Sequence, residues 1–151
     1  MITSNKQLKR IVALGALLAA SMVQGVADEQ KAGADVVKPI RSEKLPNVPG
    51  KTLTAVTVNY APGAKSSPHH HAGSVFAYVL SGAIKSENSA TGPARVYKAG
   101  ETFFEPPGSQ HLISENASAT EPASMLAVFI ADDGAQLTTF GSGSPTPMPT
   151  K

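Results

Sequence analysis

The chain has 151 residues, of which 41% are hydrophobic and 16% charged, which suits one compact domain and is too short for two good cores. Its 13 Lys and Arg against 11 Asp and Glu give a formal net charge of only +2, and it has no cysteine. This composition excludes disulfides, a thiolate nucleophile and a cysteine-based zinc site.

The first 27 residues have the layout of a secretory signal peptide. A basic start containing Lys6, Lys9 and Arg10 precedes an apolar run over residues 11–23, and small residues end the segment at Ala27. The alternative is a membrane anchor, but the apolar run is shorter than the ~20 residues that a spanning helix needs. We therefore expect cleavage after Ala27, a periplasmic or secreted protein, and no stable membrane insertion of the mature chain.

Cleavage at that point changes the charge of the chain. It removes three cations and leaves 10 Lys and Arg against 11 Asp and Glu, a net charge of −1. No basic face remains, so we expect no nucleic-acid partner.

Two segments flank the expected folded body. Residues 28–50 are polar and contain three prolines, which prevent a long helix. They predict an irregular N-terminal arm with room for one short edge strand. Residues 141–151 have the Gly, Ser, Thr and Pro content of a disordered tail. The folded domain is therefore expected at residues 51–140.

Within this body the apolar residues form short runs of strand length, rich in Val, Phe, Tyr, Ile and Thr, with no helical period. Turn residues such as Pro62-Gly63, Gly82 and Gly100 separate the runs. Seven strands are predicted in chain order, at residues 52–60, 74–82, 83–87, 94–100, 101–105, 111–116 and 123–131. Short strands with turns at this spacing predict an all-β sandwich or barrel.

The four histidines stand at only two places in the chain, three at 69–71 and one at His111. In an extended segment residues two apart point to the same side, so His69 and His71 can reach one point while His70 faces away. His111 follows a turn, and a barrel could bring it opposite the pair. Imidazole is the commonest metal-binding side chain. The pattern therefore predicts a three-histidine metal site, with surface or hydrogen-bonded histidines as the alternative.

Two spaced motifs around these histidines resemble the signatures of the cupins. The opening signature, G-x5-H-x-H-x3,4-E-x6-G, is matched by Gly63, His69, His71 and Gly82. The closing signature, G-x5-P-x-G-x2-H-x3-N, is matched by Gly100, Pro106, Gly108 and His111. The chain thus resembles the small single-domain (type-2) cupins, and the resemblance implies a double-stranded β-helix, or jelly-roll barrel.

The sequence departs from these signatures at two positions. The Glu that many cupins use as a fourth ligand would fall at Val75 or Phe76, and the final Asn would fall at Glu115, one place before Asn116. Without that Glu, three neutral imidazoles leave more positions at a metal open for water, O2 or a chelating substrate. The competing consequence is weaker binding, at a site that has decayed.

Glu105 is a candidate for the missing charge. It stands six residues before His111, just ahead of two prolines. Its carboxylate could be a fourth ligand, a partner that orients a histidine, or a general base. The alternative is an exposed carboxylate at a strand end.

Strand parity predicts an apolar pocket beside the histidines. If Val75 faces inward then so do Ala77 and Val79, whereas Phe76, Tyr78 and Leu80 would pack outward against the other sheet. Tyr60 and Gln110 are the candidate polar contacts, together with Glu105. Such a pocket suits a small, partly apolar molecule better than a sugar phosphate, which would need an inward Arg or Lys.

The resemblance implies a three-histidine, metal-dependent enzyme of the dioxygenase type that acts on a small molecule. It would hold one divalent transition metal, iron for a dioxygenase, with Zn, Mn, Ni or Cu as alternatives. A non-catalytic cupin that binds or senses a small ligand is one alternative function. Another is a lyase, isomerase or hydrolase that uses the metal as a Lewis acid and Glu105 as base. A homodimer is also an option, because edge strands in such barrels commonly find a partner.

Overall fold

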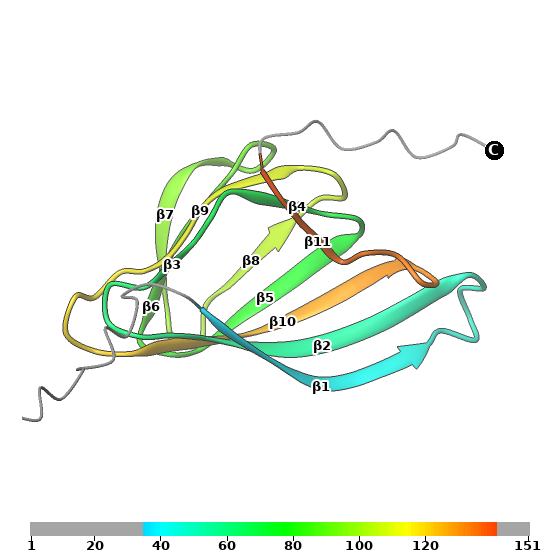
Figure 1. The fold of residues 1–151 in the computed structure, drawn as a ribbon, viewed down its shortest axis with the longest axis horizontal. Coiled ribbons are helices and arrows are strands. Elements are labelled where there is room, and N and C mark those ends of the chain that lie inside the picture. The colour runs from blue at the N-terminus through cyan, green and yellow to red at the C-terminus, as the bar shows by residue number, and fades with distance from the viewer. Residues whose placement is uncertain (1–34, 142–151) are drawn as a thin grey trace, which may run out of the picture.

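The computed structural model describes residues 35–141, which fold into two antiparallel β-sheets that face each other (Figure 1). The first sheet has the order β1 (Val36–Lys44), β2 (Lys51–Tyr60), β10 (Ala123–Asp132), β5 (Ser74–Ser81) and β8 (Thr102–Glu105). The second has the order β11 (Thr138–Phe140), β4 (His69–His71), β9 (Gln110–Asn116), β6 (Ala83–Asn88) and β7 (Gly92–Lys98), and β3 (Lys65–Ser66) also pairs with β9. The described residues contain no helix long and apolar enough to cross a membrane.

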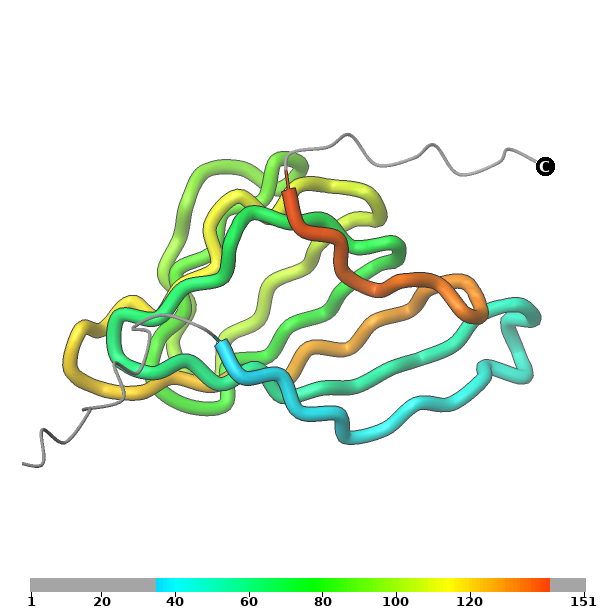
Figure 2. The backbone as a smooth tube through the Cα atoms, viewed as in Figure 1, coloured from blue at the N-terminus to red at the C-terminus, as the bar shows by residue number. Residues whose placement is uncertain are grey.

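The all-β fold class predicted from the short apolar runs is confirmed. Each of the seven predicted strands corresponds to an observed one, from β2 and β5 through to β10. The backbone trace shows the chain passing repeatedly between the two layers (Figure 2). The predicted signal peptide, and the predicted tail beyond its first residue, lie outside the described residues.

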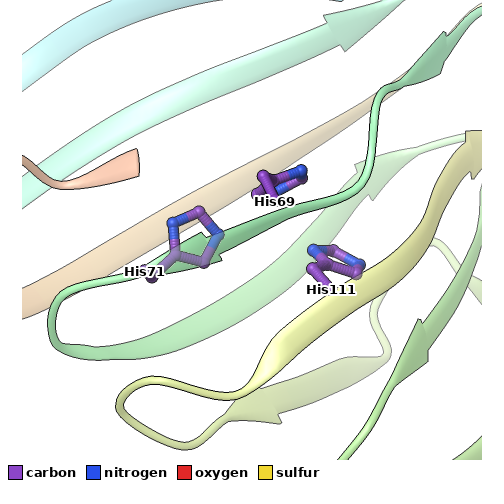
Figure 3. A group of neighbouring side chains, drawn as sticks. All are labelled: His69, His71 and His111. Carbon is purple, nitrogen blue, oxygen red and sulfur yellow. The ribbon is translucent and has the colours of Figure 1, made fainter. Parts of the chain in front are cut away.

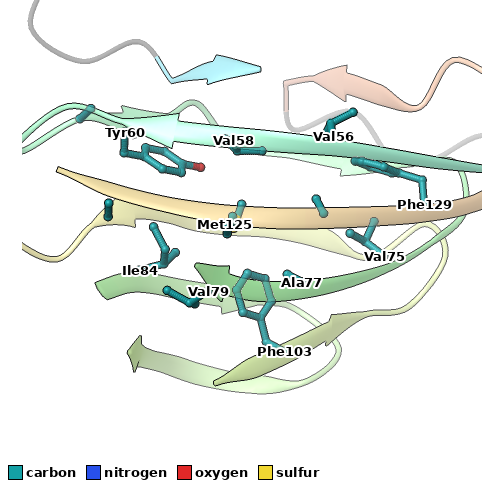
Figure 4. Packing of buried hydrophobic residues seen from close by; sticks show 13 residues of the cluster. Val56, Val58, Tyr60, Val75, Ala77, Val79, Ile84, Phe103, Met125 and Phe129 are labelled. Atoms are coloured by element: carbon teal, nitrogen blue, oxygen red, sulfur yellow. The ribbon is translucent and has the colours of Figure 1, made fainter. Parts of the chain in front are cut away.

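The core lies between the two sheets, because alternate residues of each strand point inward. In β10 the buried positions alternate regularly with less buried ones over most of the strand. Figure 4 shows the apolar side chains from β2, β5 and β10 meeting in the interlayer space. The larger members of this cluster are Val56, Val58, Tyr60, Val75, Val79, Ile84, Phe103, Met125 and Phe129.

The N-terminal arm needs a correction. We expected residues 28–50 to be irregular apart from one short strand, but nine of them, Val36–Lys44, form β1 at the edge of the first sheet. Pro39, one of the three prolines that argued against a long helix, is compatible with an edge strand, since only one side of the strand is paired. The pairing register shifts between Pro39 and Arg41, which accommodates it. The folded part therefore begins before residue 51.

The outward face of β5 also differs from the prediction. Phe76, Tyr78 and Leu80 were expected to pack against the other sheet, but they are 46%, 38% and 46% exposed. Only one side of each sheet faces the interior between the two sheets. On β5 that side carries the alternate, buried residues, so the other side faces outward. The outward Phe76 instead lies level with Phe104 of β8 and Val128 of β10 on the outer face of the first sheet.

Gly73 allows the chain to cross from the second sheet to the first. It stands between β4 and β5, directly against the backbone of β10. A Cβ atom at this position would collide with the carbonyl oxygen of Ile130 and would lie 2.7 Å from the Cα atom of Ala131. Because Gly73 can approach β10 this closely, the chain can enter β5 directly after β4, the strand that carries the two inward histidines.

We predict that Gly73→Ala lowers the free energy of unfolding by about 3 kcal/mol, because an added methyl group must displace strand backbone. The matched control is Gly134→Ala, where the added Cβ meets nothing within 4 Å and only the positive φ of 76° is unfavourable. That control should lose about 1 kcal/mol. Urea unfolding of both variants measures the difference, and equal losses would contradict the crossing argument.

Candidate metal centre

Three of the four histidines lie together inside the barrel, on neighbouring strands of the second sheet. His69 and His71 point inward from β4, and His111 points inward from β9, where it pairs directly with His69. All three side chains are buried, and one ring nitrogen from each lies within 4.8 Å of the other two (Figure 3). The predicted parity is confirmed, since His70 between them is only half-buried and lies on the opposite side of the strand.

The turn before β9 is bonded to the end of β4. The backbone N–H of Gly108, in the turn after the two prolines, donates to the carbonyl oxygen of His71 at 3.0 Å. The glycine has a φ of 70°, which suits it to this tight turn. This contact and the β4–β9 pairing hold the two histidine segments in one position relative to each other.

Protein carbonyl groups fix the rings of the β4 histidines. Nδ1 of His69 lies 2.7 Å from the carbonyl oxygen of Ser67, and Nδ1 of His71 lies 3.1 Å from that of Leu137. A carbonyl oxygen can only accept, so in each ring Nδ1 carries the hydrogen. Nε2 is then the unprotonated nitrogen, which is the form that binds a metal.

His111 is held by a different group. Its Nε2 lies 2.9 Å from the hydroxyl oxygen of Ser86 on β6, and its buried Nδ1 has no hydrogen-bond partner of acceptable geometry. In the tautomer whose Nδ1–H faces Oε2 of Glu105 at 3.1 Å, the hydroxyl of Ser86 donates to Nε2. In the tautomer whose Nε2–H donates to Ser86, Nδ1 is unprotonated, and the cluster offers a metal three unprotonated nitrogens, each on a ring anchored through its other nitrogen.

Glu105 lies beside the histidines and is 2% exposed. Its Oε2 atom is 3.1 Å from Nδ1 of His111 and 3.8 Å from Nε2 of His71. In the first sheet Glu105 pairs with Val75, the position where the cupin signature places its glutamate. The sequence prediction of an inward carboxylate therefore agrees with the geometry, and the exposed alternative is wrong.

Sequence reasoning missed two polar residues of β6. Ser86 anchors the His111 ring, and the side-chain amide of Asn88 donates to Glu105 at 3.3 Å and to Ser109 at 2.9 Å. Both lie outside the two cupin motifs. Their only signal is the pairing of β6 with β9, which sets Asn88 level with His111 and is not readable from a local pattern.

Burial governs the protonation of the cluster. It lowers the pKa of His69, and it lowers the pKa of His71 to about 4. Burial acts to raise the pKa of Glu105, but the hydrogen bond and charge of His111, with smaller effects from the other two histidines, outweigh it and lower the pKa. At neutral pH the site thus holds the carboxylate of Glu105 beside the neutral imidazoles of His69 and His71, a buried negative charge that a cation would compensate. The residues fit a divalent metal ion.

The histidines open onto a pocket of about 270 Å³ between the sheets. Of the predicted lining residues, Tyr60, Val75 and Ala77 do line it, as does Glu105. Val79 is fully buried in the core but does not reach the pocket, and Gln110 does not line it either. Gln110 immediately precedes His111 on β9, so its side chain points to the opposite side of the strand from the inward His111.

Comparisons with known proteins agree with this architecture. A family model described as "Cupin domain" matches residues 56–129. No curated protein is a significant match. A solved structure of an uncharacterized conserved protein with a double-stranded β-helix domain, from Klebsiella pneumoniae, superposes with a TM-score of 0.56 at 20% identity, covering 74% of this chain and 87% of that one.

Two solved enzymes have a similar fold. The DMSP lyase DddQ from Ruegeria pomeroyi has a TM-score of 0.57 at 18% identity, with 75% of this chain and 54% of the lyase covered. A recombinant oxalate oxidase in complex with glycolate has a TM-score of 0.56 at 23% identity, with 74% and 57% covered. The chain thus spans just over half of each enzyme, and at these identities the likeness concerns the fold alone.

The two facing sheets and the buried histidine cluster define a small double-stranded β-helix protein with a candidate metal centre. Residues 56–129 belong to the cupin domain family, as the two motifs around the histidines predicted.

We predict that the metal-free protein loses stability as the pH falls from 6.5 to 4. Burial lowers the pKa of His71 from 6.5 to about 4, so the unfolded chain takes up a proton at this position before the folded chain does. The contribution of His71 is at most about 3 kcal/mol.

Urea unfolding at several pH values tests this expectation. His71→Gln should reduce the loss of stability between pH 6.5 and 4, whereas His70→Gln, outside the cluster on the same strand, should retain it. An unchanged pH dependence in His71→Gln would contradict the assignment.

Proposed function

We propose that this cupin is a metal-dependent enzyme that acts on a small, partly apolar molecule, with one divalent transition metal held by His69, His71 and His111. The convergence of three anchored ring nitrogens within 4.8 Å carries the proposal. Imidazole nitrogen suits Fe, Ni, Cu and Zn, and the carboxylate of Glu105 next to the rings suits Mn as well.

The residues around the cluster supply the other requirements of a reaction site. Val75, Ala77 and Phe129 give the pocket an apolar lining, and Glu105 holds a charge that can accept a proton. When bound, the metal would polarise a substrate or supply redox chemistry at its open positions. Ser67, Leu137 and Ser86 orient the rings, so that little rearrangement accompanies binding.

The leading reaction class is an oxidation by O2 of the dioxygenase type. Three protein nitrogens leave positions for both O2 and a chelating substrate, and the pocket is large enough for a one-ring molecule. A lyase and an oxidase share this fold among the solved structures, so the fold does not choose the reaction and the site residues must.

The position of Glu105 favours a second candidate, Lewis-acid chemistry with this carboxylate as general base. Glu105 is buried, ionised at neutral pH and 3.1 Å from His111, which places it within reach of a molecule bound at the histidines. A lyase, isomerase or hydrolase with Zn or Mn needs such a base.

We predict that the protein, purified without a histidine tag and supplied with Fe, Zn, Mn, Ni or Cu, retains about one equivalent of metal. His111→Ala should retain less than about a tenth of an equivalent, because one of three ligands is lost. His70→Ala should bind as the wild type does, since its side chain faces away from the cluster. Elemental analysis after gel filtration measures the content, and less than about a tenth of an equivalent in the wild type for every metal contradicts the proposed ligand set.

We predict that the activity of Glu105→Gln distinguishes the two reaction classes, when the enzyme is assayed with catechol and related one-ring molecules. A dioxygenase consumes O2 when loaded with iron, as an oxygen electrode records, and does not need Glu105 as a base. A Lewis-acid enzyme turns over without O2 when loaded with Zn or Mn, and Glu105→Gln should lower its kcat by about 10²- to 10⁴-fold with the metal retained. Ligand binding without turnover at any metal loading would contradict both enzyme classes and would favour the alternative of a non-catalytic binding or sensing protein.

Export and self-association stay predictions. The predicted signal peptide over residues 1–27 lies outside the described residues. Cell fractionation, followed by detection of the protein in the periplasmic fraction, would test for export. Gel filtration with light scattering would test for the homodimer.

A further inference from the structure

One wall of the pocket carries a continuous chain of hydroxyl groups. The hydroxyl of Tyr60, at the end of β2, lies 2.7 Å from Oγ of Ser114 on β9 and 3.0 Å from Oγ of Ser66 on β3. Ser66 Oγ in turn donates to Oδ2 of Asp35 at 2.9 Å. All four residues line the pocket, and Figure 4 shows the Tyr60 hydroxyl directed into the interior.

The carboxylate at one end sets the direction of every hydrogen in this chain. Each hydroxyl has a single hydrogen to donate. Ser66 gives its hydrogen to Asp35, so Tyr60 must donate to Ser66. Tyr60 has then used its hydrogen, so Ser114 must donate to Tyr60. Burial raises the pKa of Tyr60 to about 12, which keeps its hydroxyl protonated at neutral pH.

Ser114, at the far end of this chain of hydroxyl groups, therefore presents only lone pairs to the pocket. Ser114 is 3% exposed, and its hydrogen is already given to Tyr60. Its oxygen can accept a hydrogen bond from a bound molecule but cannot donate one. The carboxylates of Asp35 and Glu105 also line the pocket, and no Lys or Arg among the described residues does. The pocket thus has negative charge and hydrogen-bond acceptors, and its other walls are largely apolar.

We propose that the pocket selects molecules with an apolar body and a hydroxyl or amine hydrogen-bond donor, which binds to Ser114 Oγ, and that it disfavours carboxylates. This deepens the proposed function by naming a substrate class for the same site. The size is consistent, because a cavity of about 150 Å³ holds benzene. A pocket of about 270 Å³ has room for one ring with a polar substituent.

Four probes of one ring each test the proposal, namely phenol, benzylamine, anisole and benzoate. Phenol and benzylamine carry donors, anisole carries only an acceptor, and benzoate is an anion. Binding to the full mature chain is followed by calorimetry or ligand-observed NMR, both as purified and after removal of metal. Phenol or benzylamine should bind about tenfold more tightly than anisole, the value of one hydrogen bond at a buried acceptor. Benzoate should bind the metal-free protein more weakly than either donor.

Two variants locate the preference. Ser114→Ala removes the terminal acceptor and should bring phenol to the affinity of anisole. Ser66→Ala leaves Ser114 in place, but it breaks the link to Asp35, frees the hydrogen of Tyr60 and so releases Ser114 to donate. The preference for phenol over anisole should shrink or reverse. Ser66 is only half-buried, so this variant should fold even if Ser114→Ala does not.

The matched control is Ser81→Ala. Ser81 also shares a hydroxyl–hydroxyl hydrogen bond, 2.7 Å to Ser124, but it is exposed and does not line the pocket, so the preference should be unchanged. Equal binding of phenol, benzylamine and anisole by the wild type, or benzoate as the tightest ligand of the metal-free protein, would overturn the proposal. So would an unchanged preference in Ser66→Ala. The metal content of the same samples tests the proposed function separately, since the donor preference does not need the metal.

Discussion

The site depends on the buried contact between Glu105 and the rings of His71 and His111. A carboxylate removed from water loses several kcal/mol of solvation unless donors or positive charge surround it. Here the nearest groups are Nδ1 of His111 at 3.1 Å and the amide of Asn88 at 3.3 Å. Burial of His69 and His71 lowers the pKa of both imidazoles, so these two rings do not readily supply the charge themselves. A metal cation would satisfy the carboxylate and the three nitrogens together.

The rest of the interior divides into two regions with different tasks. Apolar side chains such as Val79 and Ile84 fill the space between the sheets and stabilise the fold. The histidine cluster and the hydroxyl chain of Tyr60 occupy polar positions on the walls of the pocket. Both regions lie on strands, whose backbone is fixed by ladder hydrogen bonds, so the polar groups are held in place before any ligand arrives.

Much of the fold was predictable because its signals are local. Gly63, Gly82, Gly100 and Gly108, the glycines of the two motifs, all have positive φ in turns, a conformation that favours glycine strongly. The inward direction of Val75 and Ala77 followed from strand parity. The extent of β1 was underestimated, as one short edge strand in an irregular arm, because its proline and charged residues resemble a loop; its place at a sheet edge makes them acceptable. The outward aromatic residues of β5 were misplaced because parity gives a side but not a neighbour.

The sequence alone determined the all-β class, the turns and the shared side of His69 and His71, since these depend on residues adjacent in the chain. The tertiary structure decided that Glu105 stands beside Val75, that Ser86 anchors His111, and that Asp35 orients the hydroxyls of Ser66 and Tyr60. These contacts join residues on different strands. Their register is set by the packing of two whole sheets around one core, which no local pattern encodes.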